Sequence, residues 1–171
     1  MKDKENIALI GMPAVGKSTV GVLLAKKMGF DFMDTDILIQ TKERQTLAQI
    51  IARRGLEQFL EIEKQHLLGI QCAGHVIATG GSVVYKPETM RHLAETCIVV
   101  YLAIDLEVLK TRLADVITRG VAIARGKTID DLYRERVPLY ERYADLTVHC
   151  QKKFPDQVMA AILRSLPGYR A

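Results

Sequence analysis

Residues 11–19 of this chain, GMPAVGKST, are the ones whose types and spacing most directly indicate chemistry. Gly11, Gly16, Lys17 and Ser18 fit the pattern GxxxxGK[ST] at every position. The segment lies between a short apolar run and a helical pattern, which is the context that the motif requires. Glycines let backbone N–H groups turn toward phosphates, and the positive end of the following helix dipole stabilises the phosphate charge. The segment therefore predicts a site for a nucleoside triphosphate.

The side chains of this loop have separate expected roles. Lys17 would reach the β- and γ-phosphates, and the hydroxyl of Ser18 would ligate Mg²⁺. The residues that we expect to contact the nucleotide are Gly11, Ala14, Val15, Gly16, Lys17, Ser18 and Thr19. The chain has no NKxD sequence to recognise guanine, which disfavours a GTPase.

Two further polar stretches follow predicted strands. Asp34 and Asp36 lie at the end of the second predicted strand, and Gly80 and Gly81 follow the third. Because neighbouring parallel strands end at the same edge, both stretches should face the phosphates. One carboxylate could hold the metal through water, and the other could orient a hydroxyl group for in-line attack. The alternatives are an aspartate that only caps the next helix and a glycine pair that only makes a turn.

The rest of the chain predicts the scaffold for these groups. Buried strands are expected at 7–10, 30–34, 76–79, 97–104 and 146–150, and helical patterns separate them. Gly29 should end the first helix, and the helical region at about 36–70 is interrupted at Gly55. This alternation predicts an α/β fold of the P-loop NTPase type: a doubly wound, five-stranded parallel sheet flanked by helices, in one domain over 1–171.

Composition limits the partners. The chain has 171 residues, with 24 lysines and arginines against 20 aspartates and glutamates, and its basic residues are scattered. We therefore expect no nucleic acid partner, because nucleic acid binders carry a basic stripe. Cys72, Cys97 and Cys150 lack metal-binding spacing and fit buried thiols in a reducing cytosol. No apolar run approaches the roughly 18–20 residues that cross a bilayer. We expect a cytoplasmic monomer without membrane contact.

Several of these stretches together resemble the shikimate kinases, a family of small P-loop kinases. They are GMPAVGKST, DTD, TGG, RVPLYERYAD and KFP, in that order, and they extend over nearly the whole chain. The resemblance implies a kinase that transfers the γ-phosphoryl group of ATP, with Mg²⁺, to a hydroxyl group of a small metabolite. Shikimate, phosphorylated to shikimate 3-phosphate, is the default acceptor. The resemblance also implies a helical substrate-binding region at about 36–70 and a lid at about 113–126.

The resemblance assigns roles to matching positions. Lys17, Asp36 and Arg119 are the implied catalytic residues, with Asp36 as the candidate base and Arg119 as the lid arginine that reaches the transferred phosphate. Ser18 and Asp34 are implied on the metal side. The residues implied to bind the acceptor are Asp36, Gly80, Gly81 and Arg136, the last holding its carboxylate. Arg112 and Pro155 match the pair that flanks adenine.

The chain departs from the family pattern in its acceptor half. Leu60 stands where the family has an arginine that is the other clamp on the carboxylate, and Ser82 replaces a third glycine. The lid reads RGVAI where RPLL is usual. A leucine donates no hydrogen bond, so we predict that shikimate is a poor substrate. Arg53 and Arg54 are second candidates for the missing donor, against the alternative of a solvated helix face.

Two other functions stay open at this point. A nucleoside monophosphate kinase would need several arginines converging on the acceptor phosphate, and the leucine weakens that reading. A non-catalytic, ATP-binding regulatory domain would have a decayed acceptor site. The catalytic groups are all retained while the departures concentrate on acceptor recognition, which favours altered specificity over decay.

Overall fold

The computed structural model describes residues 4–114 and 127–168. Its sheet has five parallel strands in the order β2-β3-β1-β4-β5, which confirms the predicted doubly wound fold. The strands are β1 (Asn6–Ile10), β2 (Asp31–Asp34), β3 (His75–Ala78), β4 (Cys97–Ala103) and β5 (Leu146–His149). All five residues of the central strand β1 are buried, because helices cover both faces of the sheet.

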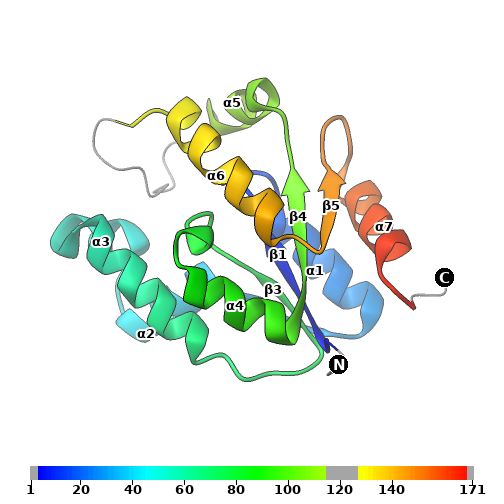
Figure 1. The fold of residues 1–171 in the computed structure, drawn as a ribbon, viewed down its shortest axis with the longest axis horizontal. Helices are drawn as coiled ribbons and strands as arrows, with labels where there is room; N and C mark the ends of the chain where they lie inside the picture. The colour runs from blue at the N-terminus through cyan, green and yellow to red at the C-terminus, as the bar shows by residue number, and fades with distance from the viewer. Residues whose placement is uncertain (1–3, 115–126, 169–171) are drawn as a thin grey trace.

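Helices connect the strands and pack on the two faces (Figure 1). They are α1 (Lys17–Met28), α2 (Thr35–Glu43), α3 (Leu47–Leu68), the short 3-10 helix η1 (Val83–Tyr85), α4 (Pro87–Thr96), α5 (Leu106–Ala114), α6 (Ile129–Tyr143) and α7 (Pro155–Ser165). The α1 and α7 helices pack against each other, while α4 and α6 lie over the opposite face near β4. Gly29 ends α1 in the left-handed conformation, as its sequence position predicts.

The helical region predicted at 36–70 consists of two helices that extend from the sheet (Figure 1). Thr46 and Gln49 form a reciprocal capping box that starts α3. Gly55 interrupts α3 with φ 80° and ψ 167°, a conformation that is open almost only to glycine. The interruption predicted from the sequence is therefore a real break, and Leu60 and Glu63 are buried residues of the segment after it.

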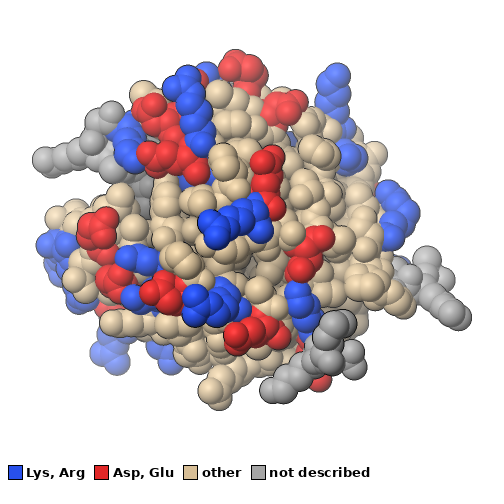
Figure 2. Space-filling model, in the orientation of Figure 1, with Lys and Arg blue, Asp and Glu red and all other residues tan. Residues whose placement is uncertain are grey.

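The surface seen in Figure 2 carries basic and acidic side chains interspersed over α4, α6 and the neighbouring elements. Cys97 and Cys150 are buried, Cys72 is half-buried, and all three are free thiols. Within residues 4–114 and 127–168, no helix is both long enough and apolar enough to cross a membrane.

Candidate active site

The phosphate loop follows β1 and opens directly into α1. Gly11 and Gly16 both have positive φ, and a Cβ atom on Gly11 would lie 2.7 Å from the backbone oxygen of Leu102 in β4. The Lys17 ammonium folds back over the loop and donates to the carbonyl oxygens of Gly11 at 2.8 Å and Met12 at 2.9 Å. Burial lowers the pKa of Lys17 to about 8, an effect that nearby Asp36 opposes. The loop thus holds its lysine where a phosphate would bind.

Asp34 joins the end of β2 to this loop. Its Oδ2 accepts a hydrogen bond from the Ser18 hydroxyl at 2.6 Å, and its Oδ1 accepts from the backbone N–H groups of Asp36 at 3.0 Å and Ile37 at 3.3 Å. One oxygen of this aspartate therefore caps α2, as the alternative interpretation predicts, and the other faces the phosphate loop, while the metal role stays a prediction. A hydroxyl and a carboxylate oxygen side by side form a donor pair that suits Mg²⁺.

Two carboxyl groups converge on Gly80. A Cβ atom there would lie 2.5 Å from Glu63 Oε1 and 2.9 Å from Asp36 Oδ1, so any side chain would displace them. Burial and the neighbouring Asp34 raise the pKa of Asp36, while Lys17 opposes the rise. Carboxylates from α2 and α3 thus meet at the end of β3, next to the phosphate loop.

Glu63 follows Leu60 by one helical turn on α3, where an arginine at position 60 would be its partner. Ser82 takes up that partnership, because its hydroxyl lies 3.0 Å from Glu63 Oε1 and 2.9 Å from Oε2 and donates to this carboxyl group. Burial raises the pKa of Glu63 to about 7, although the hydrogen bond from Ser82 opposes the rise. The serine that departs from the glycine pattern therefore satisfies the carboxyl group that the leucine leaves without an arginine.

Arg136, on α6, reaches the surface formed by Asp36, Glu63, Gly80 and Gly81, which we call the acceptor wall. A Cβ atom on Gly81 would lie 3.0 Å from Arg136 Nη1 and 3.0 Å from Pro13 Cδ in the phosphate loop. Among the described residues, the buried charged side chains are Lys17, Glu63 and Arg136, at 8%, 2% and 2% exposure. Buried charge is costly and concentrates at functional sites, so this convergence marks the active site more firmly than any single motif.

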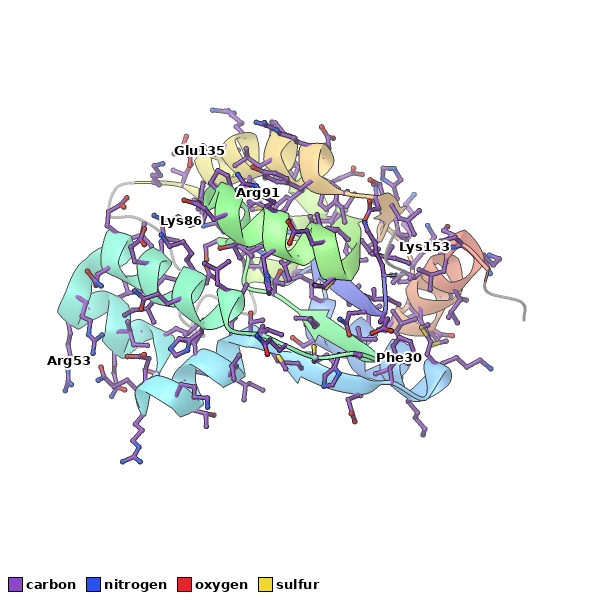
Figure 3. The ribbon with its side chains drawn as sticks, turned by 60° about the horizontal axis from the view of Figure 1, so that its bottom comes forward. Phe30, Arg53, Lys86, Arg91, Glu135 and Lys153 are labelled. Atoms are coloured by element: carbon purple, nitrogen blue, oxygen red, sulfur yellow. The ribbon has the colours of Figure 1, made fainter. Side chains whose placement is uncertain are left out.

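A pocket of about 310 Å³ opens beside Arg136. Its lining residues are Leu56, Glu57, Leu60, Tyr85, Lys86, Lys127, Leu132, Glu135 and Arg136. Lys86 and Glu135 lie on the same side of the molecule, on the segment before α4 and on α6 (Figure 3).

The two arginines suggested as replacements lie elsewhere. Arg53 is exposed and extends from the outer part of α3, away from Lys86 and Glu135 (Figure 3). Arg54 is also exposed, and its guanidinium pairs with Glu43 at 3.4 Å. Neither lines the pocket beside Leu60, where Lys86 is a cation that sequence reasoning did not consider. Lys86 pairs with Glu61, the residue that follows Leu60.

The predicted adenine side lies around α5 and the start of α7. Arg112 donates from Nη1 to the carbonyl oxygen of Val15 at 3.1 Å and from Nη2 to that of Cys150 at 3.5 Å. It therefore connects the phosphate loop to the turn that leads into exposed Pro155, at the start of α7. Arg119 and residues 115–126 of the predicted lid lie outside the described residues.

A parallel sheet with a phosphate loop at its centre and carboxylates at the adjoining strand ends defines a P-loop phosphotransferase. The family model described as shikimate kinase matches residues 13–167, and the chain belongs to the shikimate kinase family. Shikimate kinase from Synechococcus sp. is 40% identical over 166 residues, which cover 95% of this chain and 86% of that protein. The one from Rippkaea orientalis is 36% identical over 169 residues, covering 95% and 88%.

Solved structures agree with this assignment. Shikimate kinase from Acinetobacter baumannii in complex with shikimate superposes with a TM-score of 0.86 at 28% identity, covering 95% of this chain and 93% of that one. Shikimate kinase from Aquifex aeolicus superposes with a TM-score of 0.80 at 31% identity, covering 95% and 96%.

Proposed function

We propose that this protein is an ATP-dependent kinase that phosphorylates a hydroxyl group of shikimate to give shikimate 3-phosphate. The observation that carries the proposal is the geometry around Gly80 and Gly81. The space that side chains would fill there is bordered by Asp36, Arg136 and Pro13 of the phosphate loop. A small acceptor held against this glycine pair would lie beside the γ-phosphate of a nucleotide bound in the loop. Membership of the shikimate kinase family supports shikimate as that acceptor.

The donor half would bind Mg²⁺ and ATP. Ser18 and Asp34 would hold the metal through their adjacent oxygen atoms, and the bound metal would neutralise negative charge on the phosphates. Lys17 would exchange its two loop carbonyl partners for phosphate oxygens. Arg112, which contacts the loop, and Pro155 would flank the adenine ring.

The acceptor half would orient the hydroxyl group. Asp36 would accept its hydrogen bond and take its proton as the oxygen attacks the γ-phosphorus, the bond to the bridging oxygen breaks and ADP leaves. Arg136 would bind the carboxylate of shikimate. Arg119 stays a prediction for stabilising charge on the transferred phosphoryl group.

The test is a comparison of acceptors with the purified protein. We expect ATP- and Mg²⁺-dependent formation of shikimate 3-phosphate, identified by mass spectrometry. Quinate, sugar acids, polyols and nucleoside monophosphates serve as competing acceptors in parallel reactions. Faster turnover of one of these than of shikimate would replace the proposed acceptor. No turnover of any, with Mg-ATP bound, would favour a non-catalytic ATP-binding domain.

A further inference from the structure

Tyr85 lies at the end of η1, three residues after Ser82, and borders the pocket beside Arg136. The Arg136 guanidinium carbon lies 5.1 Å from the centre of the Tyr85 ring, within the range of a cation–π interaction. Arg136 Nε–H also donates to the Tyr85 hydroxyl oxygen at 3.0 Å. One aromatic side chain therefore contacts the guanidinium in two ways.

The direction of these hydrogen bonds is fixed by Glu135. The Tyr85 hydroxyl donates its single proton to Glu135 Oε2 at 3.0 Å, which leaves its lone pairs for Arg136. Lys127 also pairs with Glu135. The hydrogen bonds from Lys127 and Tyr85 lower the pKa of Glu135, so this residue stays an acceptor at neutral pH. Donation therefore runs from Arg136 to Tyr85 and from Tyr85 to Glu135, and Glu135 also accepts from Lys127.

The bond from Nε also sets which edge of the guanidinium faces the acceptor wall. With Nε directed to Tyr85, Nη1 lies toward Gly81. Leu60 lines the same pocket and donates nothing, and the lysines of the lining, Lys86 and Lys127, already pair with carboxylates. Recognition of an anionic group on this side therefore depends heavily on Arg136. A guanidinium already held in its binding orientation loses less conformational entropy when the acceptor binds.

We propose that Tyr85 is a positioning residue for acceptor binding, which holds Arg136 in the orientation that receives the carboxylate of the acceptor. This inference rests on the proposed function, in which Arg136 binds that carboxylate. A purely structural role for Tyr85 makes a different prediction, because a loosened fold would affect all substrates and not only anionic acceptors.

The experiment uses Tyr85→Phe in the full chain, which keeps the ring and removes the hydroxyl group. We expect KM for shikimate to rise about tenfold, the value of one hydrogen bond to a charged group, with kcat and KM for ATP within twofold of the unmodified protein. With the methyl ester of shikimate, which lacks the charge, kcat/KM should change less than twofold. The matched control is Tyr133→Phe, which removes a hydroxyl that donates to the Ile104 carbonyl oxygen at 2.9 Å. Tyr133 does not line the pocket, so this change should leave KM for shikimate unchanged.

Other results of these experiments would overturn the positioning role of Tyr85 or the proposed function. An unchanged KM for shikimate in Tyr85→Phe, or equal losses with shikimate and its ester, would overturn the positioning role while leaving the proposed function in place. Failure of the unmodified protein to phosphorylate shikimate would overturn the proposed function and this inference with it. The Arg136→Lys variant has no guanidinium Nε–H for Tyr85 to accept. In that background, Tyr85→Phe should therefore have no additional effect on KM for shikimate.

Discussion

The phosphate loop takes its groups from consecutive residues, 11–18, whereas the acceptor wall is assembled from α2, α3, η1 and α6. In the loop, backbone geometry sets the positions of the groups, and a side chain at Gly11 would meet the backbone of β4. In the wall, side chains that are far apart in sequence satisfy one another. A distributed site of this kind can change in pairs, and we interpret Leu60 and Ser82 as such a pair, because the serine donates to the carboxyl group of Glu63.

Leu60 and Ser82 carry no charge, whereas the family pattern has a charged arginine at the first of these positions. Burial raises the pKa of Glu63 to about 7, and the hydrogen bond from Ser82 opposes this rise less than a guanidinium would. The acceptor half therefore has less positive charge than its relatives' pattern implies, while the donor half retains every charged group of its motif. The following substitutions test the donor half and the acceptor half independently.

The largest effect is expected from Asp36→Asn. The amide cannot take the proton of the acceptor hydroxyl, so kcat should fall by roughly 10²–10⁴-fold while KM for ATP stays nearly unchanged. Steady-state kinetics at saturating Mg-ATP measure both. Asp31→Asn, an exposed change at the start of the preceding strand β2, should keep full activity. A kcat within tenfold of the unmodified protein would remove Asp36 from the base role.

Glu63→Gln tests, through the free energy of unfolding, whether Glu63 is protonated in the folded protein. Burial raises the pKa of Glu63 from 4.5 to about 7, so the folded state favours the protonated form. The stability that this side chain contributes is present below pH 4.5 and is lost as pH rises through about 7. Relative to the unmodified protein, Glu63→Gln should gain on the order of 3 kcal/mol between about pH 5 and about pH 8. Urea unfolding at both values measures this gain. A difference independent of pH would show that Glu63 is ionised throughout.

Lys17→Ala tests the donor half alone. Mg-ATP at about a hundred times its dissociation constant should stabilise the unmodified protein by about 2.7 kcal/mol, and the variant should lose most of this gain. Stabilisation by shikimate should persist, because Lys17 belongs to the phosphate loop. A thermal scan with each ligand separates the two effects, and equal loss of both would show that the halves are coupled before catalysis.

The smallest of these effects is expected from Leu60→Arg. One restored charge-assisted hydrogen bond is worth up to roughly 1.5–3 kcal/mol, which should raise kcat/KM for shikimate. Glu63 lies one helical turn away and could hold the new guanidinium, but Ser82 already occupies it. The gain should therefore be larger in Leu60→Arg/Ser82→Gly than in the single variant. Efficient turnover of shikimate by the unmodified protein, unimproved by either change, would point to Lys86 as the second cation.

The sequence predicted the donor half and the scaffold because their signals are local. Continuous apolar runs mark buried strands, and Gly29 and Gly55 mark helix breaks at their own positions. Asn6 was missed as the first residue of β1, because its buried amide bonds backbone oxygens of Cys72 and Thr96, which lie far along the chain.

The acceptor half was predicted less completely because its decisive contacts are not local. Ser82 and Glu63 are 19 residues apart, and Tyr85 and Arg136 are 51 apart. No periodicity links such positions, and η1, with three residues, is too short to produce a pattern. Leu60 could be recognised from the sequence as the loss of an arginine. The contact that explains Ser82, its hydrogen bond to Glu63, is visible only in the folded structure.

The convergence of Lys17, Glu63 and Arg136 has a consequence for protein engineering. These buried charges make the ligand-binding edge of the sheet the place where neutral substitutions gain most in stability. Selection of variants for heat resistance without ligands should therefore enrich changes at these positions and yield robust but inactive proteins. Selection in the presence of Mg-ATP and shikimate should direct stabilising changes to the outer helices instead.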